Sequence, residues 1–81
     1  MNIAEAQGVK HFLLQSHDQY RELAERHHQL DDRLHKLTEK HHLSDSEQLE
    51  ETTIKKHKLA LKDRMEQIVL DWAREHPRST S

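Results

Sequence analysis

The feature that most constrains this fold is a stripe of mainly leucine and histidine side chains that recurs every three or four residues over about four heptads, between positions 9 and 41. In a helix this spacing forms one narrow stripe, here called the seam, which packs against a partner helix. The pattern therefore predicts a long helix with a helical partner, and it places two histidines in the seam. With Leu13 as position a, the a positions are Leu13, Tyr20, His27, Leu34 and His41, and the d positions are Val9, Ser16, Leu23, Leu30 and Leu37.

Composition bounds the size and the class of the domain. The chain has 81 residues, of which 32% are hydrophobic and 35% are charged, so it allows one small domain without a large core. A single glycine and a single proline favour long helices. The sustained seam argues against disorder. We therefore expect an all-α protein.

Charge and hydropathy exclude several classes of protein. The formal charge of −2 gives no global basic field for nucleic acids, and the absence of cysteine excludes disulfides and thiolate sites. The first residues lack the pattern of a signal peptide. The longest apolar runs, 12–14 and 68–70, are too short to span a membrane. We expect a cytoplasmic protein without membrane contacts, and no motif calls for a cofactor.

The first predicted helix covers residues 8–40, and the predicted turn covers residues 41–45. Ser44 and Glu47 have the spacing of a capping box, in which the serine hydroxyl and the glutamate carboxylate each accept a backbone N–H. A second helix should therefore begin near residue 46.

The second predicted helix covers residues 46–75 and has a seam of its own. Proline 77 ends this helix, because the residue before a proline disfavours helical backbone. We expect residues 77–81 to form a loose tail. The second seam holds Ile54, Lys58, Leu61, Met65, Ile68 and Trp72, and Leu49, His57, Ala60 and Val69 widen it.

A short turn between two long amphipathic helices makes them antiparallel neighbours. In that arrangement the two seams match along their whole length. The sequence therefore predicts one domain over residues 1–81, an antiparallel two-helix hairpin resembling a coiled coil. The expected pairs are Leu37 with Leu49, Leu34 with Ile54, His27 with Leu61, Leu23 with Met65, Tyr20 with Ile68, and Leu13 or Ser16 with Trp72.

A two-helix hairpin has no closed core, since each helix buries only one side. The apolar residues left over cluster toward the open end, where the first helix begins and the second one ends. Exposed apolar surface of this kind marks an association site. We expect a homo-oligomer, with a dimer favoured, in which hairpins form a four-helix or larger bundle. The residues predicted for this interface are Phe12, Leu13, Leu14, Tyr20, Ile68, Val69 and Trp72.

Two segments carry a resemblance to a known family. The segment Ile54–Met65 reads IKKHKLALKDRM and resembles the LKKxKLxLKDxI segment of the YdcH-like family of small bacterial proteins. His27–Leu34 is similar to the HxxLDxxI segment of the same family, and Leu43–Asp45 stands where that family places its turn. The resemblance covers roughly residues 12–70, although Arg64 stands where an acidic residue is usual. It implies a helical hairpin of unknown function with no catalytic residues.

Nine histidines make the chain unusually rich in this residue. His28, Asp32 and His35 are spaced to lie on one helix face, which makes them weak candidates for a transition-metal site. The alternative is a solvated face on which histidine–carboxylate pairs contribute about 0.3 kcal/mol each. This alternative is favoured, and we assign no metal site.

Two of the histidines suggest a response to pH. His27 and His41 occupy a positions, where burial favours the neutral imidazole and makes its protonation costly. On this hypothesis, association weakens as the pH falls below about 6. The alternative is that His27 is a tolerated polar residue that fixes the register of the helices, as buried polar residues do in coiled coils.

A basic stretch runs along the second helix. Basic helices can contact phosphates, but acidic residues flank this one and no aromatic side chain interleaves it. A solvated charged face is therefore favoured over nucleic-acid binding. The stretch consists of Lys55, Lys56, Lys58, Lys62 and Arg64.

The sequence offers no catalytic constellation, because it lacks a glycine-rich phosphate loop and a nucleophilic cysteine. We expect a non-enzymatic interaction or adaptor protein that acts through self-association and through helix–helix contacts with an unidentified protein partner. Two alternatives stay open. One is association with a nucleic acid or a regulatory complex through the basic face, and the other is a histidine-based metal or pH sensor.

Overall fold

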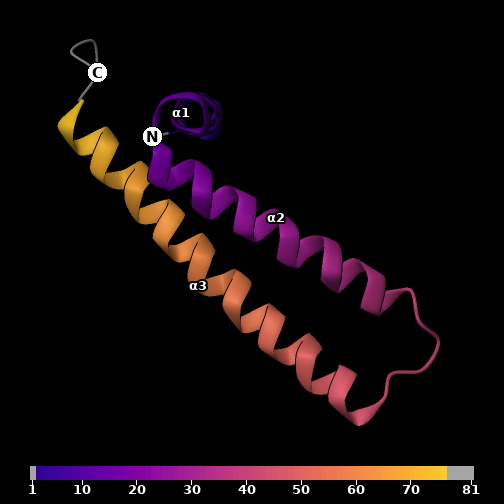
Figure 1. Ribbon diagram of the computed structural model, residues 1–81. Helices are drawn as coiled ribbons and strands as arrows, with labels where there is room; N and C mark the ends of the chain where they lie inside the picture. The colour runs from indigo at the N-terminus through magenta and orange to yellow at the C-terminus, as the bar shows by residue number, and fades with distance from the viewer. Residues whose placement is uncertain (1, 77–81) are drawn as a thin grey trace.

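A computed structural model describes residues 2–76 of the chain (Figure 1). Within these residues the chain forms three helices, α1 (Ile3–Ser16), α2 (Asp18–Thr38) and α3 (Asp45–Glu75), and no strands. The all-α class predicted from the sequence is confirmed for this part of the chain. The tail predicted for residues 77–81 lies outside the described residues.

The single helix predicted over residues 8–40 is wrong, because the chain breaks at His17 and forms α1 and α2 instead. His17 has extended backbone angles, with φ −116° and ψ 107°. Its N–H donates to the carbonyl of Leu13 at 2.8 Å, which ends α1. Its ring Nδ1 accepts the N–H of Tyr20 at 3.0 Å, which begins α2. One imidazole thus takes the place of the serine or aspartate that usually caps a helix start.

Helices α2 and α3 lie side by side and run in opposite directions, joined by the loop of residues 39–44 (Figure 1). Each turns one apolar face toward the other, as amphipathic helices do. Leu49 departs from the predicted pairing with Leu37, because its side chain is 69% exposed while Leu37 is fully buried. Glu47 and Ile54 lie on the inner side of α3, and Leu49 follows Glu47 by two positions, which turns it away from α2. The buried residues of the two helices are Tyr20, Leu23, Leu37, Ile54, Leu61 and Val69.

Helix α1 crosses the other two helices near the start of α2 and the end of α3. Figure 1 looks down the axis of α1 while α2 and α3 run across the view. Leu13 of α1, Tyr20 of α2 and Val69 of α3 form a buried cluster. Their cluster takes one residue from each helix, so α1 closes the end of the pair that the predicted hairpin would leave open. Partly buried side chains pack around the cluster, namely Val9, Met65, Ile68 and Trp72.

Ion pairs link the helices at their edges and fix how they align. Arg33 of α2 holds both carboxylate oxygens of Glu50 of α3, with N–O distances of 2.8 and 2.9 Å. Lys58 of α3 pairs with Asp31 of α2. Exposed pairs of this kind contribute about 1 kcal/mol or less, so the two pairs select the register more than they stabilise the fold.

The start of α3 is the best-capped point of the chain. Ser44 Oγ accepts the N–H of Glu47 at 3.2 Å, and the Glu47 carboxylate accepts the N–H of Ser44 at 3.0 Å. Lys40 also donates to this carboxylate. The hydrogen bond from Lys40, followed by the bonds from Ser44, lowers the pKa of Glu47 from an ordinary 4.5 to about 2.

Replacing His17 tests the role of its ring as a helix cap. We expect His17→Ala to lower the free energy of unfolding by about 1 kcal/mol, because the N–H of Tyr20 loses its acceptor. Urea denaturation followed by circular dichroism measures the change. His17→Asn is the matched control, since its side-chain oxygen restores an acceptor. An asparagine variant as unstable as the alanine variant would contradict the assignment.

The lowered pKa of Glu47 predicts how stability changes in acid. A folded-state pKa below the ordinary value stabilises the fold above pH 4.5, and this contribution is lost as the pH falls toward about 2. We expect Glu47→Gln to be less stable than the wild type at neutral pH. Between pH 4.5 and about pH 2, the variant should lose less stability than the wild type does. The matched control is Glu22→Gln, on an exposed face of α2. Equal acid profiles for wild type and Glu47→Gln would refute this account.

Candidate interaction surfaces

Six large apolar side chains remain exposed in the described chain, and five of them lie on two surfaces. The N-terminal patch lies on one side of α1 and holds Ile3 and Leu14, which are 78% and 40% exposed. Phe12, which is 49% exposed, lies on the opposite side of α1, because two positions turn a side chain by about 200° around the helix axis. The second surface lies on the side of α3 that faces away from α2. It holds Leu49, Leu59 and Leu70, which are 69%, 62% and 52% exposed.

The structure separates the seven residues predicted for the interface into three groups. Leu13, Tyr20 and Val69 are buried inside the chain, where α1 packs against α2 and α3. Phe12 and Leu14 are exposed. Ile68 and Trp72 are partly buried against the internal cluster. Several apolar side chains predicted for an interface at the open end are therefore buried within the chain. The sequence pattern did not predict this, because it makes α1 part of a longer helix.

Three rings meet at the end of α3. The ring centroids of Phe12 and Trp72 lie 5.6 Å apart at an interplanar angle of 54°, and those of Trp72 and His76 lie 4.4 Å apart at 14°. His76 also caps the helix, since its backbone N–H bonds to the carbonyl of Trp72 at 2.9 Å. These contacts tie α1 to the last turn of α3. The i, i+4 spacing of Trp72 and His76 is the sequence signal for the stacked pair.

A polar group bridges α1 and α3 beside this end. Lys10 of α1 pairs with Glu66 of α3 at 2.9 Å. Its hydrogen bond to Glu66 raises the pKa of Lys10. Burial raises the pKa of the neighbouring Tyr20 hydroxyl, because the phenolate is poorly solvated there. The pair thus holds α1 over the internal cluster, a role that the sequence did not indicate.

The two histidines proposed for the pH response lie in different surroundings. His27 is partly buried on α2, as its seam position requires. His41 lies in the loop after α2 and is exposed, so it does not belong to the seam. Helix α2 ends at Thr38, before the heptad pattern reaches His41. Only His27 therefore keeps the setting on which the pH hypothesis was based.

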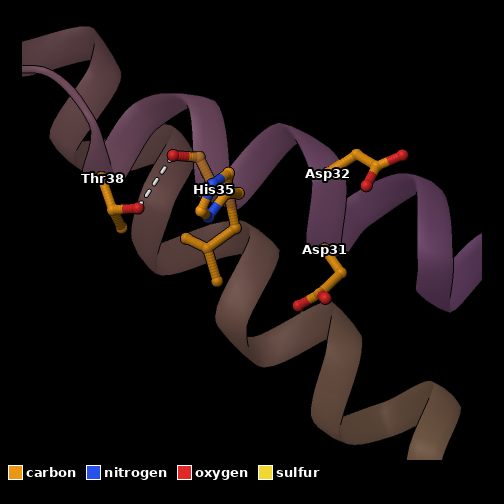
Figure 2. A pocket seen from close by; sticks show the side chains of 5 residues that line it. Asp31, Asp32, His35 and Thr38 are labelled. Atoms are coloured by element: carbon orange, nitrogen blue, oxygen red, sulfur yellow. Dashed lines mark hydrogen bonds between the residues drawn. The ribbon is translucent and has the colours of Figure 1, made fainter.

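The candidate metal ligands are divided between separate pairs. His28 Nε2 lies 3.5 Å from Asp32, whereas His35 Nε2 lies 3.0 Å from Glu39. Figure 2 shows a shallow depression beside them, in which the carboxylates of Asp31 and Asp32 point away from each other. Within residues 2–76, no three histidine, aspartate or glutamate side chains gather closely enough to hold a metal ion. The predicted spacing therefore gives two histidine–carboxylate pairs here.

The basic stretch of α3 is partly neutralised by acidic neighbours. Lys58 pairs with Asp31 of α2, and Lys55 lies 3.6 Å from Glu51. The hydrogen bond from Lys58 lowers the pKa of Asp31, which keeps this carboxylate charged. These two lysines are therefore less available for a phosphate backbone than the sequence suggested. The stretch forms a mixed surface in which Lys56 and Asp63 are both exposed.

None of the helices in the described part of the chain is both long and apolar enough to cross a membrane. No curated protein and no solved structure is similar to the chain. Residues 21–69 match a family described as "Protein of unknown function (DUF465)". The match takes in nearly all of α2, the loop and most of α3, which is more than half of the sequence. The chain therefore belongs to this family of unknown function.

Proposed function

We propose that this chain is a non-enzymatic interaction protein that self-associates through helix–helix contacts, with a dimer as its basic unit. The observation that carries the proposal is the exposure of six large apolar side chains on a fold this small. Exposed apolar groups gathered on a helix face mark association surfaces more often than isolated ones do. An adaptor needs such a surface and no catalytic group.

The fold itself supports the proposal. Two paired helices form a single layer, and each helix buries only the side that faces its neighbour. Only seven hydrophobic residues are buried in the described chain. Burying half of an exposed leucine in a contact between copies contributes about 1 kcal/mol. Several leucines together offset part of the entropy lost when two copies associate.

The cellular setting and the alternative of nucleic-acid binding belong to the same proposal. The resemblance of Ile54–Met65 to the YdcH-like family supports a helical fold and leaves the function open. From this resemblance we propose a bacterial, cytoplasmic setting for the chain. Nucleic-acid binding is the weaker candidate because Lys55 and Lys58 already have acidic partners. The two candidates differ in their response to salt. Phosphate contacts weaken steeply as the salt concentration rises, whereas apolar contacts do not.

Sedimentation equilibrium of the full chain tests the proposal. We expect the mean mass to rise with protein concentration from that of one chain to that of two. Raising the salt concentration should leave this association in place, because apolar contacts supply most of its free energy. Circular dichroism at each salt concentration verifies that the helices are retained.

A chain that stays monomeric at every concentration and at both low and high salt would overturn the proposal. Mobility-shift measurements with duplex DNA and with single-stranded RNA form the second arm. Salt-sensitive binding of either one by a strictly monomeric chain would favour the nucleic-acid alternative.

A further inference from the structure

The side of α3 that faces away from α2 carries leucines and charged residues in a regular arrangement. We call it the outer face, and its central residues are Leu49, Lys56, Leu59, Ala60, Asp63 and Leu70. Lys56 and Asp63 each follow a buried residue of the inner side, Ile54 and Leu61, by two positions. Two positions turn a side chain by about 200° around the helix axis, so both charges point away from α2.

The outer face repeats with the period of a coiled coil. Leu49, Lys56, Asp63 and Leu70 are spaced seven residues apart, and all four are exposed. Side chains seven residues apart lie nearly above one another on a helix. The face therefore presents one stripe in the order leucine, lysine, aspartate, leucine, with Leu59 in the middle.

This order is complementary to itself when two copies run in opposite directions. With the centre between Leu59 and Ala60, Leu49 of one copy lies opposite Leu70 of the other. In the same register Lys56 lies opposite Asp63, once on each side of the centre. An isologous contact of this kind uses the same surface on both copies, as a twofold dimer requires. In this one register, both leucine contacts and both lysine–aspartate pairs form together.

Neighbouring registers lack this complementarity. A shift by one heptad in one direction places Asp63 opposite the same aspartate of the second copy, and a shift in the other direction does so for Lys56. A parallel pair in register places each of the two charges opposite itself. Like charges facing each other across helices are unfavourable. The charges of the stripe thus select one antiparallel register.

The two charges are available for such a contact. Among the described residues, Lys56 and Asp63 take part in no ion pair, whereas neighbouring Lys55 and Lys58 pair with Glu51 and Asp31. Asp45 and Arg74, one at each end of α3, are also exposed and fall opposite each other in the same register, although Arg74 lies 3.9 Å from Asp71 of its own helix. The outer face therefore carries opposite charges at matching distances from its centre.

The length of the stripe suits a reversible dimer. From Leu49 to Leu70 the helix rises about 32 Å. A helix pair of that length lies near the lower end of specific interfaces, at about 1,200 Å² of total buried surface. Helix α1 contacts α3 through Phe12 and Trp72 on the inner side. It also contacts α3 through Lys10 and Glu66, and Glu66 lies beside the outer face, since it follows Leu59 by seven positions.

We propose that the outer face of α3 binds the same face of a second copy, antiparallel, with Lys56 of each copy paired to Asp63 of the other. The proposal rests on the proposed function of self-association and specifies its surface and register. The four-helix layer that results has α3 of both copies at its centre and α2 of both copies outside. The N-terminal patch stays free in this arrangement.

Charge reversal tests the pairing. Lys56→Asp or Asp63→Lys alone places like charges opposite each other twice per dimer, and we expect each to raise the dissociation constant about tenfold. The double variant Lys56→Asp/Asp63→Lys restores both pairs with reversed sign and should dimerise nearly as the wild type does. The matched control is Arg26→Asp, an equal change of charge on an exposed position of α2. A double variant no better than the two single ones would overturn the proposal.

Cross-linking tests the register. The natural chain has no cysteine, so each engineered thiol is unique. We expect a mixture of the Leu49→Cys and Leu70→Cys chains to form an interchain disulfide under mild oxidation, while each variant alone forms little. A helix rise of about 32 Å separates the two positions within one chain. Circular dichroism checks that both variants fold.

The outcomes separate this proposal from the proposed function. A dimer by sedimentation that gives the mixed disulfide supports both. A dimer in which Leu49→Cys cross-links with itself, or in which neither thiol reacts, overturns the outer-face pairing and leaves self-association standing. A monomer without any cross-link overturns both.

Discussion

The constraint on which this structure depends is that a long amphipathic helix must bury one face, and here α2 and α3 bury theirs against each other. Leu37 and Leu61, from opposite helices, are nearly inaccessible, and Arg33 and Glu50 lock the alignment of the two helices. A single layer of two helices cannot enclose a core, so the remaining features follow from that deficit. One end is closed by α1, and the sides stay open.

The part of the fold set by periodicity could be predicted from sequence, and the part set by individual hydrogen bonds could not. The capping box at Ser44 and the inner side of α3 around Ile54 and Leu61 follow from spacing alone. The break at His17 was missed because the heptad pattern continues across it without a change of phase. An imidazole capping a helix start has no strong signal in sequence, yet α1 ends and α2 begins at that one residue.

The exposed surfaces, too, could be predicted from the sequence only in part. Exposure of Phe12 and Leu14 agrees with an apolar surplus near the end of the helices, but Leu13 and Val69 are internal because α1 packs its Leu13 against α2 and α3. Leu49 was expected inside and is exposed, because the inner side of α3 begins with Glu47. The outer face becomes visible only when the inner side is known, since the sequence pattern assigns Leu49 and Ala60 to the widened seam.

The central claim of this account is that α3 uses two faces, one toward α2 and one toward a second copy. Methyl relaxation by a soluble paramagnetic probe, measured by NMR at low and high protein concentration, tests it most directly. We predict that the methyl groups of Leu49, Leu59 and Leu70 become shielded from the probe as concentration rises, while those of Ile3 and Leu14 stay accessible. Equal accessibility of the three α3 leucines at both concentrations, in a sample shown to be dimeric, would contradict the claim.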